Sequence, residues 1–144
     1  MQALQLSVVV PVHNEEGNIV PLVAEIASVL RGRVAFEIIC VNDASRDASL
    51  EKLQAAMPDF PELRVIDHAR QSGQSTAVRT GVKAARAPWI ATLDGDGQND
   101  PADIPKLMAA RDTGDVNVKL YAGWRVHRRD TASKRWASKL ANAV

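Results

Sequence analysis

Residues 6–18, Leu-Ser-Val-Val-Val-Pro-Val-His-Asn-Glu-Glu-Gly-Asn, decide the fold class. The first seven are mostly apolar and β-branched and lack the spacing of three and four that marks a helix, so they predict a buried strand. The polar residues after Val12 end this strand. An apolar repeat at spacings of three and four over residues 18–30 then predicts an amphipathic helix. The chain therefore opens with a strand and a helix.

The same alternation continues along the chain. Further strands are predicted at residues 36–41, 63–66 and 89–93, with a weakly alternating fifth strand at residues 116–124. The other predicted helices lie at residues 49–57, 73–85, 101–114 and 130–144. Strands that alternate with helices indicate an α/β fold, with one mostly parallel sheet covered by helices on both faces. The 144 residues suit a single domain without internal repeats.

Composition excludes two classes of protein for the chain as given. Cys40 is the only cysteine and lies in an apolar strand, so a disulfide-stapled miniprotein is excluded. The longest nearly apolar run, residues 6–12, is far shorter than the roughly 20 residues that cross a bilayer. The first residues also lack the features of a secretory signal, so we expect a cytoplasmic location.

Charge is distributed unevenly along the chain. Residues 125–144 hold six basic side chains and one acidic side chain, a net charge of +5, whereas residues 1–124 carry −4. A basic segment beside an acidic domain indicates an anionic partner, such as phosphate groups, an acidic membrane surface or nucleic acid. A solvated helix that is basic by chance is the alternative. The acidic remainder of the chain argues against nucleic acid.

Polar residues follow three of the predicted strands where these strands end. Residues 14–16 follow the first strand, residues 42–47 the second and residues 94–98 the fourth. Ligands of parallel sheets bind outside the carboxyl ends of the strands, which points to residues 13–17, 42–47, 68–73 and 94–98. His13 and His68 lie there and could belong to a site, with partly exposed loop histidines as the alternative. Carboxylates crowded at these ends need a cation. Asp94 and Asp96, separated by one glycine, suit Mg²⁺ or Mn²⁺ through oxygen ligands. A simple turn of Asp and Gly residues is the alternative.

Several nucleotide-binding and hydrolytic classes lack their signatures here. No glycine-rich phosphate loop with a lysine follows the first strand, and no Gly-x-Gly-x-x-Gly occurs there, which disfavours P-loop NTPases and NAD-binding Rossmann proteins. No Gly-x-Ser-x-Gly is present either. Asp43, at a strand end, can still accept hydrogen bonds from a base or ribose, and Gly73 leaves room near phosphates.

Four segments in order resemble the inverting glycosyltransferases of family 2. They are residues 7–18, 41–47, 70–81 and 91–101. The polyprenyl-phosphate sugar transferases, the subgroup that includes dolichol-phosphate mannosyltransferase, are the most similar. The resemblance implies a GT-A fold and a UDP- or GDP-linked sugar donor. A sugar-nucleotide nucleotidylyltransferase, the other candidate enzyme, usually opens with a glycine-rich basic loop, which residues 7–17 lack.

The resemblance also implies roles for particular residues. The nucleotide site would comprise Pro11, Val12, His13, Asn14, Glu15, Asp43, Gly73, Asp94, Gly95 and Asp96. Asp43 would contact the base or ribose, whereas His13 stands where the family often has tyrosine. The metal, Mg²⁺ or Mn²⁺, would be held by Asp94, Asp96 and Gln98. Asp94, Asp96 and Arg125 would form the catalytic group, with Arg125 contacting phosphate.

The implied acceptor is a polyprenyl phosphate at the membrane surface. Arg128, Arg129 and Arg135 lie in the segment that approaches the lipid phosphate in the family. The implied reaction moves a sugar from the donor to this acceptor with inversion, and a non-catalytic nucleotide-sugar-binding module is the alternative. We expect residues 1–124 to form the nucleotide-sugar-binding core and residues 125–144 to begin the acceptor-binding, membrane-proximal region.

Members of the family usually continue well beyond this length. They carry an acceptor-binding half and, in the lipid-linked subgroup, often amphipathic or transmembrane helices. We therefore expect this chain to be a fragment with weak or absent transferase activity, located peripherally at the cytoplasmic membrane, and its full-length parent to be membrane-anchored. An uncovered sheet edge would also favour self-association into a homo-oligomer.

Overall fold

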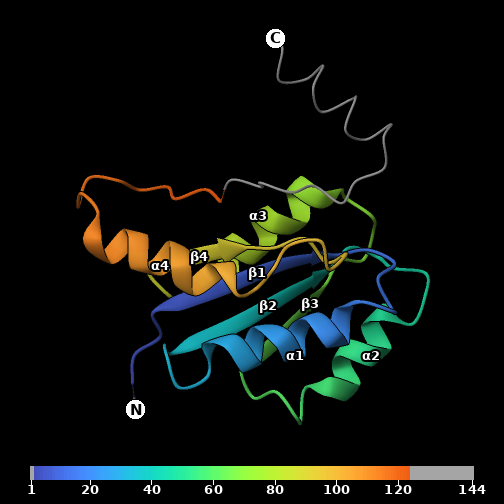
Figure 1. The fold of residues 1–144 in the computed structure, drawn as a ribbon. Helices are drawn as coiled ribbons and strands as arrows, with labels where there is room; N and C mark the ends of the chain where they lie inside the picture. Colours follow the sequence, from blue (N-terminus) through green and yellow to red (C-terminus); the bar gives the residue numbers. More distant parts are fainter. Residues whose placement is uncertain (1, 124–144) are drawn as a thin grey trace, which may run out of the picture.

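The computed structural model describes residues 2–123 and contains one parallel four-stranded sheet (Figure 1). The strands are β1 (Leu6–Val12), β2 (Phe36–Asn42), β3 (Leu63–Asp67) and β4 (Trp89–Thr92). The helices are α1 (Ile19–Leu30), α2 (Ser49–Ala56), α3 (Gln74–Ala84) and α4 (Asp103–Thr113). The strand order is β3-β2-β1-β4, and strand and helix alternate along the chain as the sequence predicts.

Strand β1 lies inside the sheet and pairs with a parallel strand on each side. It pairs with β2 from Leu6 opposite Phe36 to Val12 opposite Asn42, and with β4 from Leu6 opposite Trp89. All seven residues of β1 are buried, which explains their nearly continuous apolar character. Because the strands are parallel, their carboxyl ends and the polar loops that follow them meet at one edge of the sheet.

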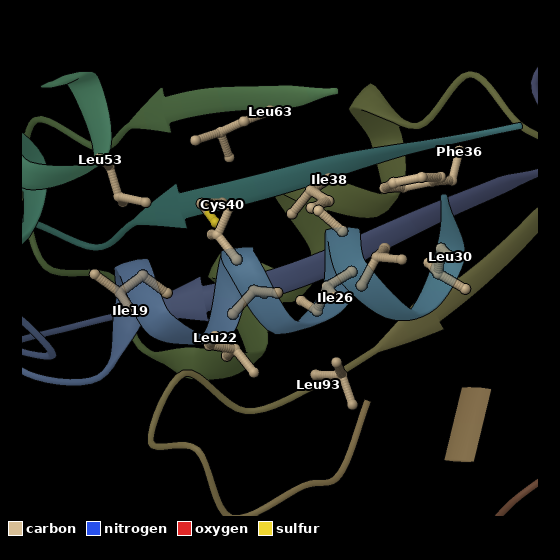
Figure 2. Packing of buried hydrophobic residues seen from close by; sticks show 14 of the residues in the cluster. Ile19, Leu22, Ile26, Leu30, Phe36, Ile38, Cys40, Leu53, Leu63 and Leu93 are labelled. Carbon is tan, nitrogen blue, oxygen red and sulfur yellow. The ribbon is translucent and has the colours of Figure 1, made fainter. Parts of the chain in front are cut away.

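Helices cover both faces of the sheet, with α1 and α2 on one face and α3 on the other (Figure 1). Figure 2 shows the first face, where α1 lies over the sheet and its Leu22 and Ile26 belong to one buried cluster with Ile38 and Cys40 of β2. Ile104 of α4 belongs to this same core cluster. A smaller cluster on the opposite face joins α3 to β2.

Residues 116–123 form no strand, so the predicted fifth strand is wrong over the part of it that the structure describes. Asp115 instead begins a turn, accepting a hydrogen bond from the Val118 amide on its carbonyl and one from the Asn117 amide on its side chain. Val116 and Leu120 are 86% and 81% exposed, so the apolar alternation does not face the core. The helix predicted at residues 130–144 lies outside the described residues.

Element boundaries otherwise move little from the sequence prediction. Helix α4 begins at Asp103, two residues after Pro101, because residues 101 and 102 form a turn. Within residues 2–123, no helix is both long and apolar enough to cross a membrane.

A buried carboxylate ties the beginnings of the strands together. Glu37 of β2, 3% exposed, accepts hydrogen bonds from the Ser7 hydroxyl at 2.7 Å, the Arg86 amide at 2.8 Å and the Arg64 guanidinium at 2.8 Å. These donors come from β1, from the α3–β4 connection and from β3. Burial by itself raises the pKa of Glu37, but the three hydrogen bonds outweigh it and hold the pKa below its usual value.

Gly81 allows α3 to lie directly on the sheet. A Cβ atom at this position would overlap Cγ1 of Val9 and would lie 3.3 Å from Cγ2 of Val41. We expect Gly81→Ala to lower the free energy of unfolding by about 1–3 kcal/mol through overpacking, despite the better helix propensity of alanine. Urea denaturation measures this. Gly17→Ala, whose Cβ would have open space, is the control, and equal stability of the two variants would contradict the close packing.

The Glu37 cluster predicts an acid-sensitive contribution to stability. Because the pKa of Glu37 is lowered on folding, its contribution is complete at neutral pH and is lost as the pH falls through the folded-state pKa. We expect Glu37→Gln to lower the free energy of unfolding at pH 7 by about 1–3 kcal/mol. The variant should also lose less stability between about pH 5 and pH 3.

Urea denaturation at both pH values, with Glu51→Gln on the exposed side of α2 as the control, tests this expectation. An unchanged acid sensitivity of Glu37→Gln would show that the cluster does not depend on the charge of Glu37.

Candidate functional site

A cavity of about 320 Å³ lies at the carboxyl ends of β1, β2 and β4. Its walls are formed by Pro11, Val12, His13, Glu15, Asp43, Gln71, Gly73, Gln74, Ala77, Asp94, Gly95 and Asp96. Nine of the ten residues predicted for the nucleotide site are among them, and Asn14 is the exception. Segments that are far apart in the sequence therefore converge on one pocket.

The loops after β1 and β2 are joined by reciprocal hydrogen bonds. Asn14 adopts a left-handed backbone conformation (φ 53°), donates its amide to Ser45 Oγ at 3.0 Å and accepts the Arg46 amide on Oδ1 at 2.8 Å. The Glu15 amide donates to Ser49 Oγ at 2.8 Å. Asn14 is exposed beside the pocket, so what the structure shows for it is a role in holding the two loops together.

The ring of His13 is fixed in one orientation at the pocket wall. Its Nδ1 lies 2.8 Å from the carbonyl oxygen of Asp43, and its Nε2 lies 3.2 Å from the side-chain nitrogen of Asn14. A carbonyl only accepts and an amide nitrogen only donates, so Nδ1 carries the proton and Nε2 accepts. The ring therefore presents a fixed flat surface beside Asp43.

Asp43 is the most constrained carboxylate of the pocket. It is 3% exposed, and its Oδ1 accepts hydrogen bonds from the Ser72 amide at 2.8 Å and from Nδ1 of His68 at 2.9 Å. Its Oδ2 accepts one from the Gly73 amide at 2.8 Å. Burial by itself raises the pKa of Asp43, but these hydrogen bonds outweigh it and hold the pKa below its usual value. The carboxylate is therefore ionised at neutral pH, with a lone pair of Oδ2 left to accept another donor.

Asp94 and Asp96 stand on the opposite side of the pocket, in the loop after β4. The loop comes close to β1: a Cβ atom on Gly95 would lie 2.8 Å from the Pro11 carbonyl oxygen, so only glycine fits there. Gly97, with a φ of 75°, supplies the turn. Glycine is thus required at these two positions for separate reasons, close approach at Gly95 and a left-handed turn at Gly97.

The predicted metal ligands do not all meet. Asp94 Oδ1 accepts a hydrogen bond from the Gln74 side chain at 2.8 Å, and Asp96 Oδ1 accepts the Gln98 amide at 3.0 Å. Gln98 lines a neighbouring, larger cavity between β4 and α4 and not the pocket with the two aspartates. Within residues 2–123, no three His, Cys, Asp or Glu side chains form a group that would hold a metal alone.

Two polar residues near the pocket were not among the ten predicted for the nucleotide site, although His68 lies at one of the predicted strand ends. Gln74, the first residue of α3, hydrogen-bonds Asp94, and His68, directly after β3, hydrogen-bonds Asp43. Gln74 directly follows Gly73 in the family-like segment of residues 70–81, and this position could have identified it as a site residue. The predicted residues Arg125, Arg128, Arg129 and Arg135 lie outside the described residues.

Comparisons with known proteins identify relatives of this chain. Residues 7–142 match the sequence profile described as "Glycosyl transferase family 2". The dodecaprenyl-phosphate galacturonate synthase of Rhizobium johnstonii is 38% identical over 132 residues, which cover 90% of this chain and 38% of that protein. The undecaprenyl-phosphate 4-deoxy-4-formamido-L-arabinose transferase of Pseudomonas aeruginosa is 39% identical over 140 residues, covering 95% and 40%. The chain thus spans about two fifths of the length of these relatives.

Solved structures share the fold. TarS of S. aureus (residues 1–349, in complex with UDP) has a TM-score of 0.65 at 24% identity, over 76% of this chain and 32% of that one. The mannosyltransferase PcManGT of Pyrobaculum calidifontis, in complex with GDP-Man and Mn²⁺, has a TM-score of 0.60 at 21% identity, over 67% and 28%. The predicted GT-A fold is therefore confirmed. With a family profile that spans nearly the whole sequence, this chain belongs to glycosyl transferase family 2.

Proposed function

We propose that this chain is the donor-binding part of a glycosyltransferase that moves a sugar from a nucleotide-sugar to a polyprenyl phosphate. The observation that carries the proposal is the pocket that Asp43, Asp94 and Asp96 line together. Two relatives named as transferring sugars to dodecaprenyl or undecaprenyl phosphate support the acceptor class. Structural neighbours in complex with UDP and with GDP-Man support a nucleotide-linked donor.

The nucleoside would lie between the loops after β1 and β2. There the His13 ring offers a flat surface, and the remaining lone pair of Asp43 Oδ2 suits a base N–H or a ribose hydroxyl. The diphosphate would then extend toward Asp94 and Asp96 on the other side of the pocket. This placement assigns recognition of the nucleoside to one wall and the charged part of the donor to the other.

The residues at the second wall suit a divalent cation held jointly with the donor. Two carboxylates, Asp94 and Asp96, supply oxygen ligands, and Mg²⁺ or Mn²⁺ typically takes its other ligands from substrate phosphates and water. A three-residue protein cluster is therefore not required. When bound, the cation would stabilise the negative charge that develops on the departing nucleoside diphosphate. Gln98 remains a further predicted ligand.

The reaction needs little help from a protein base. An oxygen of the acceptor phosphate attacks the anomeric carbon, and the bond from that carbon to the diphosphate oxygen breaks, leaving its electron pair on the nucleoside diphosphate. The acceptor phosphate is already anionic near neutral pH, so no proton needs to be removed. Basic side chains must instead hold it beside the anionic donor, and we assign this role to Arg125, Arg128, Arg129 and Arg135.

A second candidate function is binding of the donor without catalysis. It is favoured by the chain spanning only about two fifths of its relatives. In both cases the basic segment at residues 125–144 would place the protein at the cytoplasmic membrane surface. Turnover assays with undecaprenyl phosphate, on this chain and on a chain extended to the length of its relatives, separate the two functions.

One prediction of the proposed function concerns binding of the donor. We expect isothermal titration to show binding of either UDP-sugars or GDP-sugars in the presence of Mn²⁺, because the pocket holds both a nucleoside wall and a metal-compatible wall. Chelation with EDTA should weaken the affinity by about tenfold or more, equivalent to about 1.4 kcal/mol. If folded protein binds neither series, the proposed function is wrong.

A further prediction of the proposed function concerns the residue that would hold the metal. Asp96→Asn should weaken Mn²⁺-dependent donor binding by about tenfold or more and leave the residual affinity in EDTA unchanged, because it removes one ligand charge. Asp59→Asn, on the exposed α2–β3 connection, is the matched control. An affinity equal to that of the control in Mn²⁺ would mean that Asp96 is not a metal ligand.

A further inference from the structure

We propose that His68 is a positioning residue of the donor pocket, which holds the Asp43 carboxylate in the orientation that meets the nucleoside. The inference rests on the proposed function and adds to it a residue that lies outside the pocket wall. His68 does not line the pocket, whereas Asp43 does. Any effect of His68 on the donor would therefore pass through Asp43.

The backbone fixes where the imidazole lies. The His68 amide donates to the Asn42 carbonyl at 2.9 Å, which continues the pairing of β2 with β3 by one residue. The ring is thereby placed beside Asp43, the residue after Asn42, with its Nδ1 2.9 Å from Oδ1. The side chain is 15% exposed, so water competes little for this hydrogen bond.

The second ring nitrogen is anchored on α3. Nε2 lies 2.9 Å from Oγ1 of Thr80, and the Thr80 hydroxyl lies 3.0 Å from the Thr76 carbonyl one turn earlier. The ring thus spans from the end of β2 to α3 and is held at both nitrogens. A ring fixed in this way is a rigid support for the carboxylate beside it.

The ionised state of Asp43 sets the direction of its hydrogen bond with His68. The carboxylate is surrounded by N–H donors and is ionised, so it has no proton to give, and Nδ1 must be the donor. The Thr80 hydroxyl has a single hydrogen. It donates this hydrogen to Nε2 of a neutral ring, or it donates it to the Thr76 carbonyl and accepts Nε2–H of a charged ring. His68 therefore supports Asp43 whether or not the imidazole is charged.

His68 approaches Asp43 from a different direction than the other donors do. The Ser72 and Gly73 amides are adjacent in one loop and approach from the same segment, whereas His68 approaches from β3. Without His68, two amides would still donate hydrogen bonds to the carboxylate, but its orientation would be less restricted. We therefore expect loss of His68 to affect recognition of the nucleoside more than folding.

The test compares two ligands that differ by the nucleoside. Titrations in Mn²⁺ measure the affinities of inorganic diphosphate and of the nucleotide-sugar that the wild-type chain binds. His68→Leu removes both ring nitrogens, and we expect it to weaken nucleotide-sugar binding by about tenfold, as for one hydrogen bond to a charged group. Binding of diphosphate should stay within about twofold, since Asp43 does not face the phosphates in this placement.

Three further variants distinguish positioning from structural damage. His68→Asn keeps a short N–H donor and should retain most of the affinity for the nucleotide-sugar. Thr80→Val should weaken nucleotide-sugar binding less than His68→Leu does. Asp43→Asn should weaken it at least as much as His68→Leu does. Thermal unfolding without ligand measures the stability of each variant.

Two sets of outcomes would overturn the inference. In the first, His68→Leu binds the nucleotide-sugar as tightly as the wild-type chain does, whereas Asp43→Asn binds it more weakly. In the second, His68→Leu loses as much affinity for diphosphate as for the nucleotide-sugar. If His68→Leu does not fold, the comparison is made with His68→Asn instead. The inference is then overturned if His68→Asn binds the nucleotide-sugar no more tightly than Asp43→Asn does. Absence of nucleotide-sugar binding by the wild-type chain would instead overturn the proposed function, and this inference with it.

Discussion

The pairing of β1 on both of its sides is the constraint on which the rest of the structure depends. Because β1 is buried on both faces between β2 and β4, it has no surface at which its register could shift without exposing apolar side chains. That register sets Val12 beside Asn42 and brings the loops after all three strands to the same edge. The pocket is thus a consequence of sheet pairing, and it needs no separate scaffold.

The polar residues at this edge serve two different purposes. Some hold the loops to each other, as Asn14 does with Ser45 and Arg46. Others, such as Asp94 and Asp96, project into the pocket with few protein partners. A sequence motif contains both kinds in one run of residues. Substitution of the first kind would change the shape of the pocket, whereas substitution of the second would change its chemistry.

Sequence predicts those features that depend on neighbouring residues. Strands β1 to β4 follow from local apolar runs, and the metal-compatible pair follows from the spacing of Asp94 and Asp96. The prediction of a fifth strand is wrong over residues 116–123, which pair with no strand in the part of the chain that the structure describes. The contacts of His68 with Asp43 and Thr80 join three elements separated by 25 and 12 residues, so no local pattern predicts them. The site could therefore be predicted as a set of strand ends, but not as a set of contacts.

Charge explains why the two walls of the pocket must differ. Glu15, Asp43, Asp94 and Asp96 line it, with no Lys or Arg among the described lining residues, although the proposed donor is itself anionic. At Asp43 two backbone amides and His68 stabilise the ionised carboxylate through hydrogen bonds. Among the described residues, Asp94 and Asp96 have no comparable set of donors, which is why the proposed function places a cation beside them. In the proposed function, hydrogen bonds stabilise the charge of Asp43 beside the nucleoside, whereas Asp94 and Asp96 are left to a cation, so that affinity for the diphosphate would depend on the metal.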